Sequence, residues 1–164
     1  MILDRMVFLK DMICVFDIDG VLAAYEYGFK NHNICDPKNW GENEIIKTYK
    51  KARCPQTMID FVNSRDIKKN FVCSLANSNT ERFEKIKFVT HSYPNINISN
   101  IFFVENPEDK LNILYNIYAR HNYMQEKIYR DQSDIFMVDD SIEILNYIQE
   151  NSSFSTLHIS SFLD

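Results

Sequence analysis

Apolar residues along the chain form short runs that alternate with segments of helical periodicity. Five runs have the length and bounding turns of strands, namely Met12–Phe16, Phe71–Ala76, Ile101–Val104, Ile135–Val138 and a final edge strand at Ser155–Ile159. A rhythm of strand then helix is typical of a parallel sheet with helices on its faces. The pattern therefore predicts an α/β fold with a doubly wound, mostly parallel sheet and helices on both faces.

Four segments between or after these runs predict helices, because each has a start signal or apolar residues three to four positions apart. They start at Pro55, at the capping box Ser78-Asn79-Thr80-Glu81, at Asn106-Pro107 and just before Ile142. The stretch 25–53 lacks this rhythm and is interpreted as an insertion above the sheet. Without repeats or a Gly-rich linker, we expect residues 1–164 to form a single domain.

Length and charge narrow the class of protein. A chain of 164 residues can bury one ordinary core, and its net charge of −5 argues against general affinity for nucleic-acid backbone. No apolar run approaches the length of a membrane span, and charged residues interrupt the N-terminus. The four cysteines are widely spaced without a C-x-x-C pair. We therefore expect a cytoplasmic protein without a membrane partner.

Polar residues that could carry chemistry follow four of the predicted strands. Asp17 and Asp19 follow the first, Asn77 and Ser78 the second, Asp139 and Asp140 the fourth, and Lys110 lies one helical turn beyond the third. Parallel strands end at one edge of the sheet, and such folds bind ligands at that edge. We expect these segments to converge on one pocket.

Clustered carboxylates need a counter-charge. Two unit charges 4 Å apart repel by about 4 kcal/mol at an effective dielectric near 20. Lys110 supplies one positive charge, and hard carboxylate oxygens in this number suit Mg²⁺. A metal ion beside a lysine favours a phosphate, and an aspartate can attack it to give an aspartyl phosphate.

These residues resemble the signatures of the haloacid dehalogenase (HAD) superfamily of phosphatases. The run Ile13-Cys14-Val15-Phe16-Asp17-Ile18-Asp19-Gly20-Val21-Leu22 is similar to its first signature, Lys110 within Asp109-Lys110-Leu111 to its third, and Phe136-Met137-Val138-Asp139-Asp140-Ser141 to its fourth. The match covers Ile13 to Ser141 in the family's order. It implies a Rossmann-like HAD fold.

The resemblance also implies roles for the site residues. Asp17 would be the nucleophile and a magnesium ligand. Asp19 would be the general acid and then base, with its backbone carbonyl on the metal. Asp139 and Asp140 would complete the metal site, and Lys110 would hold Asp17 and the phosphate. Gly20 would permit the tight turn after the strand and would also bind the phosphate.

The second signature departs from the family pattern. The family usually has Thr or Ser at the end of the second strand, whereas Asn77 stands there in this chain, with Ser78 next. Either side chain could donate a hydrogen bond to the phosphate, although Ser78 also suits a helix cap. The choice between Asn77 and Ser78 stays open.

The insertion 25–53 resembles a minimal cap, which the family uses to select substrates. Small caps are typical of members that act on large substrates or on nucleotides. The insertion has six Lys or Arg against four Asp or Glu, a local excess of two, with aromatic residues among them. These residues could bind a nucleobase or a nucleic-acid end, but packing of the insertion on the body is favoured over this role.

We therefore expect a phosphomonoester hydrolase for a phosphorylated small molecule or nucleotide. A phosphomutase is disfavoured, because a minimal cap excludes water poorly. A signalling receiver domain is disfavoured by order, since its acidic pair comes first and here Asp139 and Asp140 come last. The alternative is a phosphate-binding or regulatory protein with weak or no turnover, which Asn77 favours. The pattern leaves the substrate and the oligomeric state open.

Overall fold

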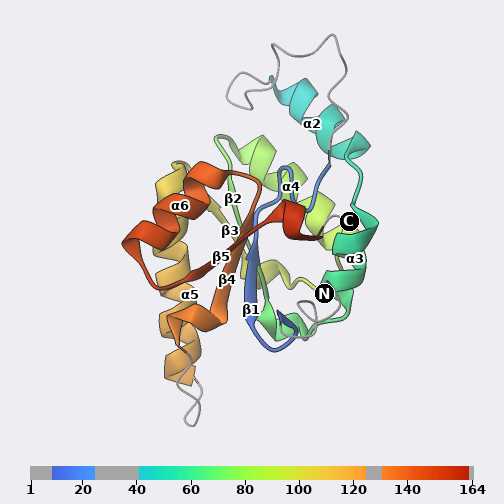
Figure 1. The fold of residues 1–164 in the computed structure, drawn as a ribbon. Helices are drawn as coiled ribbons and strands as arrows, with labels where there is room; N and C mark the ends of the chain where they lie inside the picture. The colour runs from blue at the N-terminus through green and yellow to red at the C-terminus, as the bar shows by residue number, and fades with distance from the viewer. Residues whose placement is uncertain (1–8, 25–40, 125–130, 163–164) are drawn as a thin grey trace.

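The computed structural model describes residues 9–24, 41–124 and 131–162, and its centre is a five-stranded parallel sheet (Figure 1). The strand order is β3-β2-β1-β4-β5, and every pairing is parallel. The strands are β1 (Ile13–Phe16), β2 (Asn70–Leu75), β3 (Ile101–Val104), β4 (Ile135–Asp139) and β5 (Ser155–His158). The predicted fold class and all five strands are confirmed, with ends that differ by at most one residue.

Helices cover both faces of this sheet (Figure 1). The α-helices are α2 (Glu42–Lys51), α3 (Gln56–Asn63), α4 (Asn79–Ser92), α5 (Lys110–Met124) and α6 (Ile142–Asn151). Short 3₁₀ turns precede β2, β3, α5 and β4 and follow β5; they are η2 (Ile67–Lys69), η3 (Ile98–Asn100), η4 (Pro107–Asp109), η5 (Gln132–Asp134) and η6 (Ile159–Phe162). Pro55 is the N-cap of α3 rather than its first helical residue, and the helix predicted at Asn106-Pro107 opens with the 3₁₀ turn η4.

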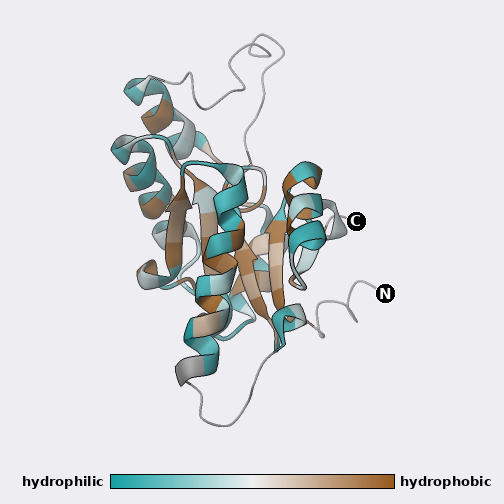
Figure 2. Ribbon diagram, turned by 90° about the vertical axis from the view of Figure 1, so that its left-hand side faces the viewer, coloured by the Kyte–Doolittle hydropathy of each residue, from teal (hydrophilic) through white to brown (hydrophobic). Residues whose placement is uncertain are grey.

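Alternation along the strands divides the core into two layers. Cys14 and Phe16 of β1 pack with α3, α4 and the C-terminal turn, whereas Ile13 and Val15 pack with α5 and α6. All four are fully buried, so β1 is enclosed on both faces. Figure 2 shows the strands as the hydrophobic centre between helices whose outer faces are hydrophilic.

Helix α2 was not predicted and belongs to the insertion. Its first turn is acidic and its last turn is basic, which matches the helix dipole. Ile45 and Tyr49, four residues apart, are its buried residues and face α4. The part of the insertion before α2, residues 25–40, lies outside the described residues.

A backbone bridge joins the two ends of the insertion. The N–H of Ala24 donates to the carbonyl of Arg53 over 2.8 Å, and the N–H of Arg53 donates back to Ala24 over 3.0 Å. The chain thus leaves the body and returns to it at one place, above the end of β1. Among the described residues, no helix is long and apolar enough to cross a membrane.

Candidate active site

The site lies where the strand order reverses direction. From β1 the chain builds β2 and β3 on one side, and then crosses to place β4 and β5 on the other. The carboxyl ends of β1 and β4 are neighbours in register, with Phe16 opposite Val138. Asp17 and Asp139 follow these two residues, and the N–H of Asp17 donates to the carbonyl of Val138 over 2.9 Å. This is the position at which doubly wound sheets bind ligands.

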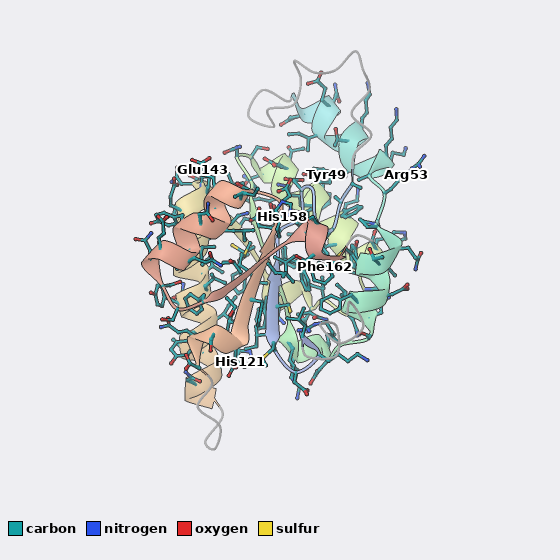
Figure 3. All side chains as sticks on the ribbon, viewed as in Figure 1. Tyr49, Arg53, His121, Glu143, His158 and Phe162 are labelled. Atoms are coloured by element: carbon teal, nitrogen blue, oxygen red, sulfur yellow. The ribbon has the colours of Figure 1, made fainter. Side chains whose placement is uncertain are left out.

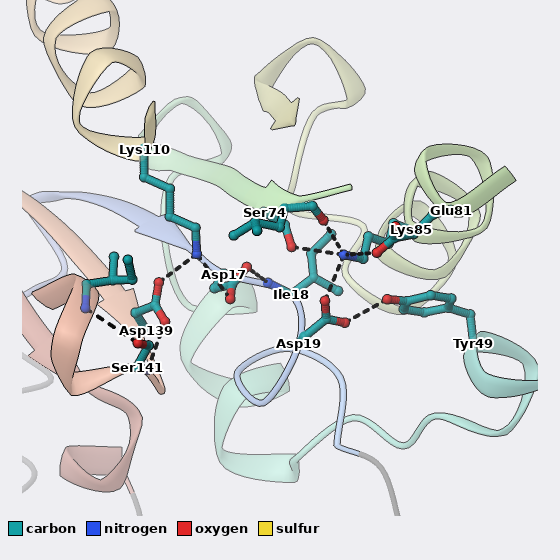
Figure 4. A network of polar contacts seen from close by, with 12 residues as sticks. Asp17, Ile18, Asp19, Tyr49, Ser74, Glu81, Lys85, Lys110, Asp139 and Ser141 are labelled. Carbon is teal, nitrogen blue, oxygen red and sulfur yellow. Dashed lines mark hydrogen bonds and ion pairs between the residues drawn. The ribbon is translucent and has the colours of Figure 1, made fainter. Parts of the chain in front are cut away.

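The ammonium group of Lys110 contacts both Asp17 and Asp139 (Figure 4). Its Nζ lies 2.7 Å from Asp139 Oδ2 and 3.2 Å from Asp17 Oδ2. Lys110 is the first residue of α5 and directly follows the 3₁₀ turn η4. Its side chain is 2% exposed, so the ammonium group is held inside the protein by the two carboxylates.

Asp140 completes a group of three carboxylates. Asp17, Asp139 and Asp140 each offer one oxygen, and these oxygens lie within 4.8 Å of one another. Two further contacts orient the acidic pair: Ser141 N–H donates to Asp139 Oδ1 over 2.9 Å, and His158 Nε2 lies 3.0 Å from the Asp140 carbonyl. A carbonyl only accepts, so the Nε2 of His158 is the protonated nitrogen.

His158 is the last residue of β5 and lies at the carboxyl end of the strands, the end of the sheet nearest to Tyr49 of α2 (Figure 3). His158 was interpreted from the sequence as a surface or structural residue. Its contact with the backbone of Asp140 fits a structural role beside the site.

Gly20 leaves room for the Asp140 carboxylate. Its φ is +75°, in the left-handed region that favours glycine. A Cβ at this position would lie 2.1 Å from Asp140 Oδ2, far inside contact distance. The Asp-x-Asp-Gly turn therefore makes a space against which Asp140 packs. Three hard oxygen donors beside this space, with one buried lysine to offset part of their charge, fit a magnesium ion.

Burial shapes the electrostatics of Asp17. Burial, together with the charges of Asp139 and Asp19, raises the pKa of Asp17 from 3.8 to about 6, although Lys110 and Lys85 act to lower it. The pKa of Asp140 is raised as well, mainly by burial and by Asp17. Burial acts to lower the pKa of Lys110, but Asp17 and Asp139 outweigh it, so that pKa is raised and the ammonium stays charged.

The side chain of Asp19 points away from this group of three carboxylates (Figure 4). Its Oδ1 accepts a hydrogen bond of 2.7 Å from the Tyr49 hydroxyl, and its Oδ2 lies 2.7 Å from Lys85 Nζ. Lys85 also pairs with Glu81 over 2.8 Å. The sequence interpretation missed Lys85, and it named Glu81 only as part of the capping box and Tyr49 only among the aromatic residues of the insertion. Glu81 and Lys85 are four residues apart, a spacing that suits an ordinary ion pair on a helix surface, so the sequence did not indicate that they are buried.

Asn77 and Ser78 lie after β2, between the sheet and α4. Ser78 is the N-cap of α4, and its Oγ accepts a bond of 3.1 Å from the N–H of Glu81. The Glu81 carboxylate reaches back to the N–H of Asn77 over 2.8 Å. The capping role predicted for Ser78 is confirmed. Which of the two residues contacts a phosphate stays a prediction.

Comparison with solved structures supports this arrangement of strands. The fold is similar to that of the HAD family enzyme BT-2542 from Bacteroides thetaiotaomicron in its magnesium complex, with a TM-score of 0.51 and 14% identity over 91% of this chain and 93% of that one. Its complex with magnesium and inorganic phosphate gives a TM-score of 0.50, at 14% identity over 90% and 93%. This chain has the haloacid dehalogenase fold.

A further similar structure has this fold too. It is the HAD domain of the effector protein Lem4 from Legionella pneumophila, with a TM-score of 0.44 and 15% identity over 90% of this chain and 84% of that one. No family model matches the sequence, and no curated protein matches it. The haloacid dehalogenase fold is recognised from the two BT-2542 structures, at a sequence identity that establishes the fold alone.

Proposed function

We propose that this chain is a magnesium-dependent phosphomonoester hydrolase that works through an aspartyl phosphate on Asp17. One observation carries the proposal: the oxygens of Asp17, Asp139 and Asp140 lie within 4.8 Å of one another, with Lys110 against two of these residues. Asp17, Asp139 and Asp140, with the Asp19 carbonyl, would hold the ion. When bound, the ion would neutralise charge on the phosphoryl oxygens.

The protein's own residues account for the remaining steps. An oxygen of Asp17 attacks phosphorus, while the bond to the leaving oxygen breaks and Asp19 gives that oxygen a proton. Water then attacks phosphorus while Asp19 takes a proton from it. The bond between phosphorus and the Asp17 oxygen breaks, which releases phosphate and regenerates the Asp17 carboxylate. Ile18 N–H, 2.8 Å from Asp17 Oδ1, and Lys110 hold the nucleophile in place.

The proposed substrates are phosphorylated small molecules or nucleotides, with a nucleic-acid end as a further candidate. Within the described part of the insertion, helix α2 lies beside the site, where the Tyr49 hydroxyl contacts Asp19. The buried positions of Ile45 and Tyr49 favour packing of α2 on the body over a role for these side chains in binding a base.

A second candidate, phosphate binding without turnover, is favoured by the region after β2. β2 ends at Leu75, so the residue at the strand end is the buried Ala76 and not Asn77, as the sequence had suggested. The Ser78 hydroxyl caps α4. No hydroxyl therefore occupies the strand end itself, where the family usually places Thr or Ser.

Incubation with Mg²⁺ and p-nitrophenyl phosphate separates the two candidates. A hydrolase releases nitrophenol in wild type and stops in Asp17→Asn, which keeps the shape of the side chain but lacks the nucleophilic carboxylate. If wild type releases no nitrophenol while inorganic phosphate still binds, the second candidate holds. Release that continues unchanged in Asp17→Asn would rule out the proposed mechanism.

A further inference from the structure

Lys85 is a fully buried cation beside the site, and the steps proposed above do not use it. Its side chain is 0% exposed, and its Nζ contacts Asp19 Oδ2 at 2.7 Å and Glu81 Oε1 at 2.8 Å. It also donates to Ser74 Oγ over 3.3 Å and to the Leu75 carbonyl. An ammonium group is costly to bury, and a pair with Glu81 could form on the surface of α4 without that cost. The burial of Lys85 therefore needs another reason.

Asp19 supplies that reason, because two helices from different parts of the chain hold its carboxylate (Figure 4). Tyr49 of α2 donates to Oδ1, and Lys85 of α4 pairs with Oδ2, each over 2.7 Å. Two contacts to the two oxygens fix the plane of the carboxyl group as well as its direction. The Asp19 side chain is 26% exposed, so it alone of the three offers substantial surface to a substrate.

Further contacts keep the two helical residues in place. The Tyr49 ring packs against Phe88 of α4, with centroids 6.2 Å apart, and lies 5.9 Å from Lys85 Nζ. Glu81 holds Lys85 and also accepts the N–H of Asn77, which ties the cluster to the chain after β2. The arrangement is thus anchored to the sheet rather than to a free surface.

We propose that Lys85 and Tyr49 are positioning residues that orient Asp19 for proton transfer. The inference rests on the hydrolase function proposed above. Neither residue reaches the substrate, since Lys85 is fully enclosed and Tyr49 is 4% exposed, so both act through Asp19. Each oxygen of Asp19 has two lone pairs, so the proton given to the leaving oxygen, and later taken from water, is carried on a lone pair that neither Tyr49 nor Lys85 uses. A carboxyl group fixed in this way transfers the proton without first losing rotational freedom.

This role has a kinetic signature that a purely structural role lacks. Tyr49→Phe removes one hydroxyl and keeps the ring against Phe88. Phenyl phosphate has a poorer leaving group than p-nitrophenyl phosphate of nearly the same shape, so its cleavage depends more on the acid. We expect Tyr49→Phe to lower kcat/KM about tenfold for phenyl phosphate and much less for the nitro compound. With the nitro compound, a burst of nitrophenol should appear, because the later attack of water also slows.

Controls separate positioning from damage to the fold. Thr48→Val removes the neighbouring hydroxyl of α2, which bonds to the carbonyl of Glu44 within the same helix, and should leave both rates unchanged. Lys85→Met alone leaves Glu81 buried without its cation, so the double variant Glu81→Gln/Lys85→Met removes both charges together. It should reproduce the selective loss for phenyl phosphate.

Equal losses for the two substrates, or a Tyr49→Phe enzyme that behaves like Thr48→Val, would overturn the positioning role while the hydrolase function stands. A wild-type protein that hydrolyses neither phosphate would overturn both proposals. The two failures are therefore distinguishable in one set of assays.

Discussion

Lys110 Nζ lies 2.7 Å from Asp139 Oδ2, and both side chains are at most 2% exposed. The pair joins the first turn of α5 to the end of β4, with Asp17 at 3.2 Å from the same ammonium group. A charge that is so deeply buried depends on its charged partner, because water cannot reach the site to take the place of that partner. Lys110 therefore stabilises the folded protein as well as the proposed nucleophile.

Replacement of Lys110 by Met should destabilise the metal-free protein by about 3 kcal/mol, because it leaves the Asp139 carboxylate buried without a cation. Urea unfolding at neutral pH measures the change. Lys87→Met is the matched control on α4, since Lys87 is 58% exposed and its pair with Glu84 should contribute less than about 0.5 kcal/mol. A Lys110→Met protein as stable as the control would contradict the buried pair.

Asp17→Asn should make the metal-free protein more stable above pH 6. The pKa of Asp17 is about 6 in the folded protein and 3.8 as a model value, so the native state keeps a proton that the unfolded chain loses. The contribution of Asp17 to stability is greatest below pH 3.8, and it falls as the pH rises from 3.8 to about 6. We expect a gain of about 1 kcal/mol at pH 7.5 that shrinks towards pH 4. A loss of stability at pH 7.5 would contradict this.

Magnesium binding should weaken as pH falls through 6. Asp17 must be ionised to bind the ion, and protons compete for its carboxylate below its pKa of about 6. Calorimetric titration with Mg²⁺ should give an affinity that drops about tenfold between pH 6 and pH 5 and levels off above pH 7. Affinity that is the same at pH 5 and pH 7.5 would remove Asp17 from the metal site.

Gly20→Ala should impair both folding and metal binding. The substitution forces a side chain into a backbone with φ of +75° and into the space held by Asp140. We expect about 2 kcal/mol of destabilisation and a weakened affinity for Mg²⁺. Gly41→Ala is the control, because its Cβ would come no closer than 3.9 Å to Glu44 Oε2. Similar effects of the two substitutions would contradict the role assigned to the turn.

The strands and the group at their ends were predictable because both depend on local pattern. Ile13 to Phe16 is an apolar run that ends in Asp17, and a parallel sheet brings such ends to one edge. The structure brings Asp17, Lys110, Asp139 and Asp140 together as predicted. The order of these residues along the chain was enough to predict that they meet, because residues that follow parallel strands lie at the same end of the sheet.

The surroundings of Asp19 were not predictable, because they depend on which face of a helix is turned inwards. The first half of α4 buries Glu81 and Lys85 and leaves Phe83 59% exposed, the reverse of an ordinary amphipathic pattern, whereas Phe88 and Val89 in its second half are buried as usual. Helix α2 has only Ile45 and Tyr49 buried, too few positions to give a clear periodicity. Hydrophobicity along the sequence therefore indicates neither the inverted half of α4 nor the two buried positions of α2.

Trapping the phosphoryl group on Asp17 tests the proposed nucleophile most directly. Wild-type protein turning over p-nitrophenyl phosphate with Mg²⁺ is quenched and treated with borohydride, which reduces an aspartyl phosphate to homoserine, and peptides are analysed by mass spectrometry. We expect homoserine at position 17 in the wild-type protein, and none in Asp17→Asn or without Mg²⁺. Turnover accompanied by modification at another residue, or by none at position 17, would contradict it.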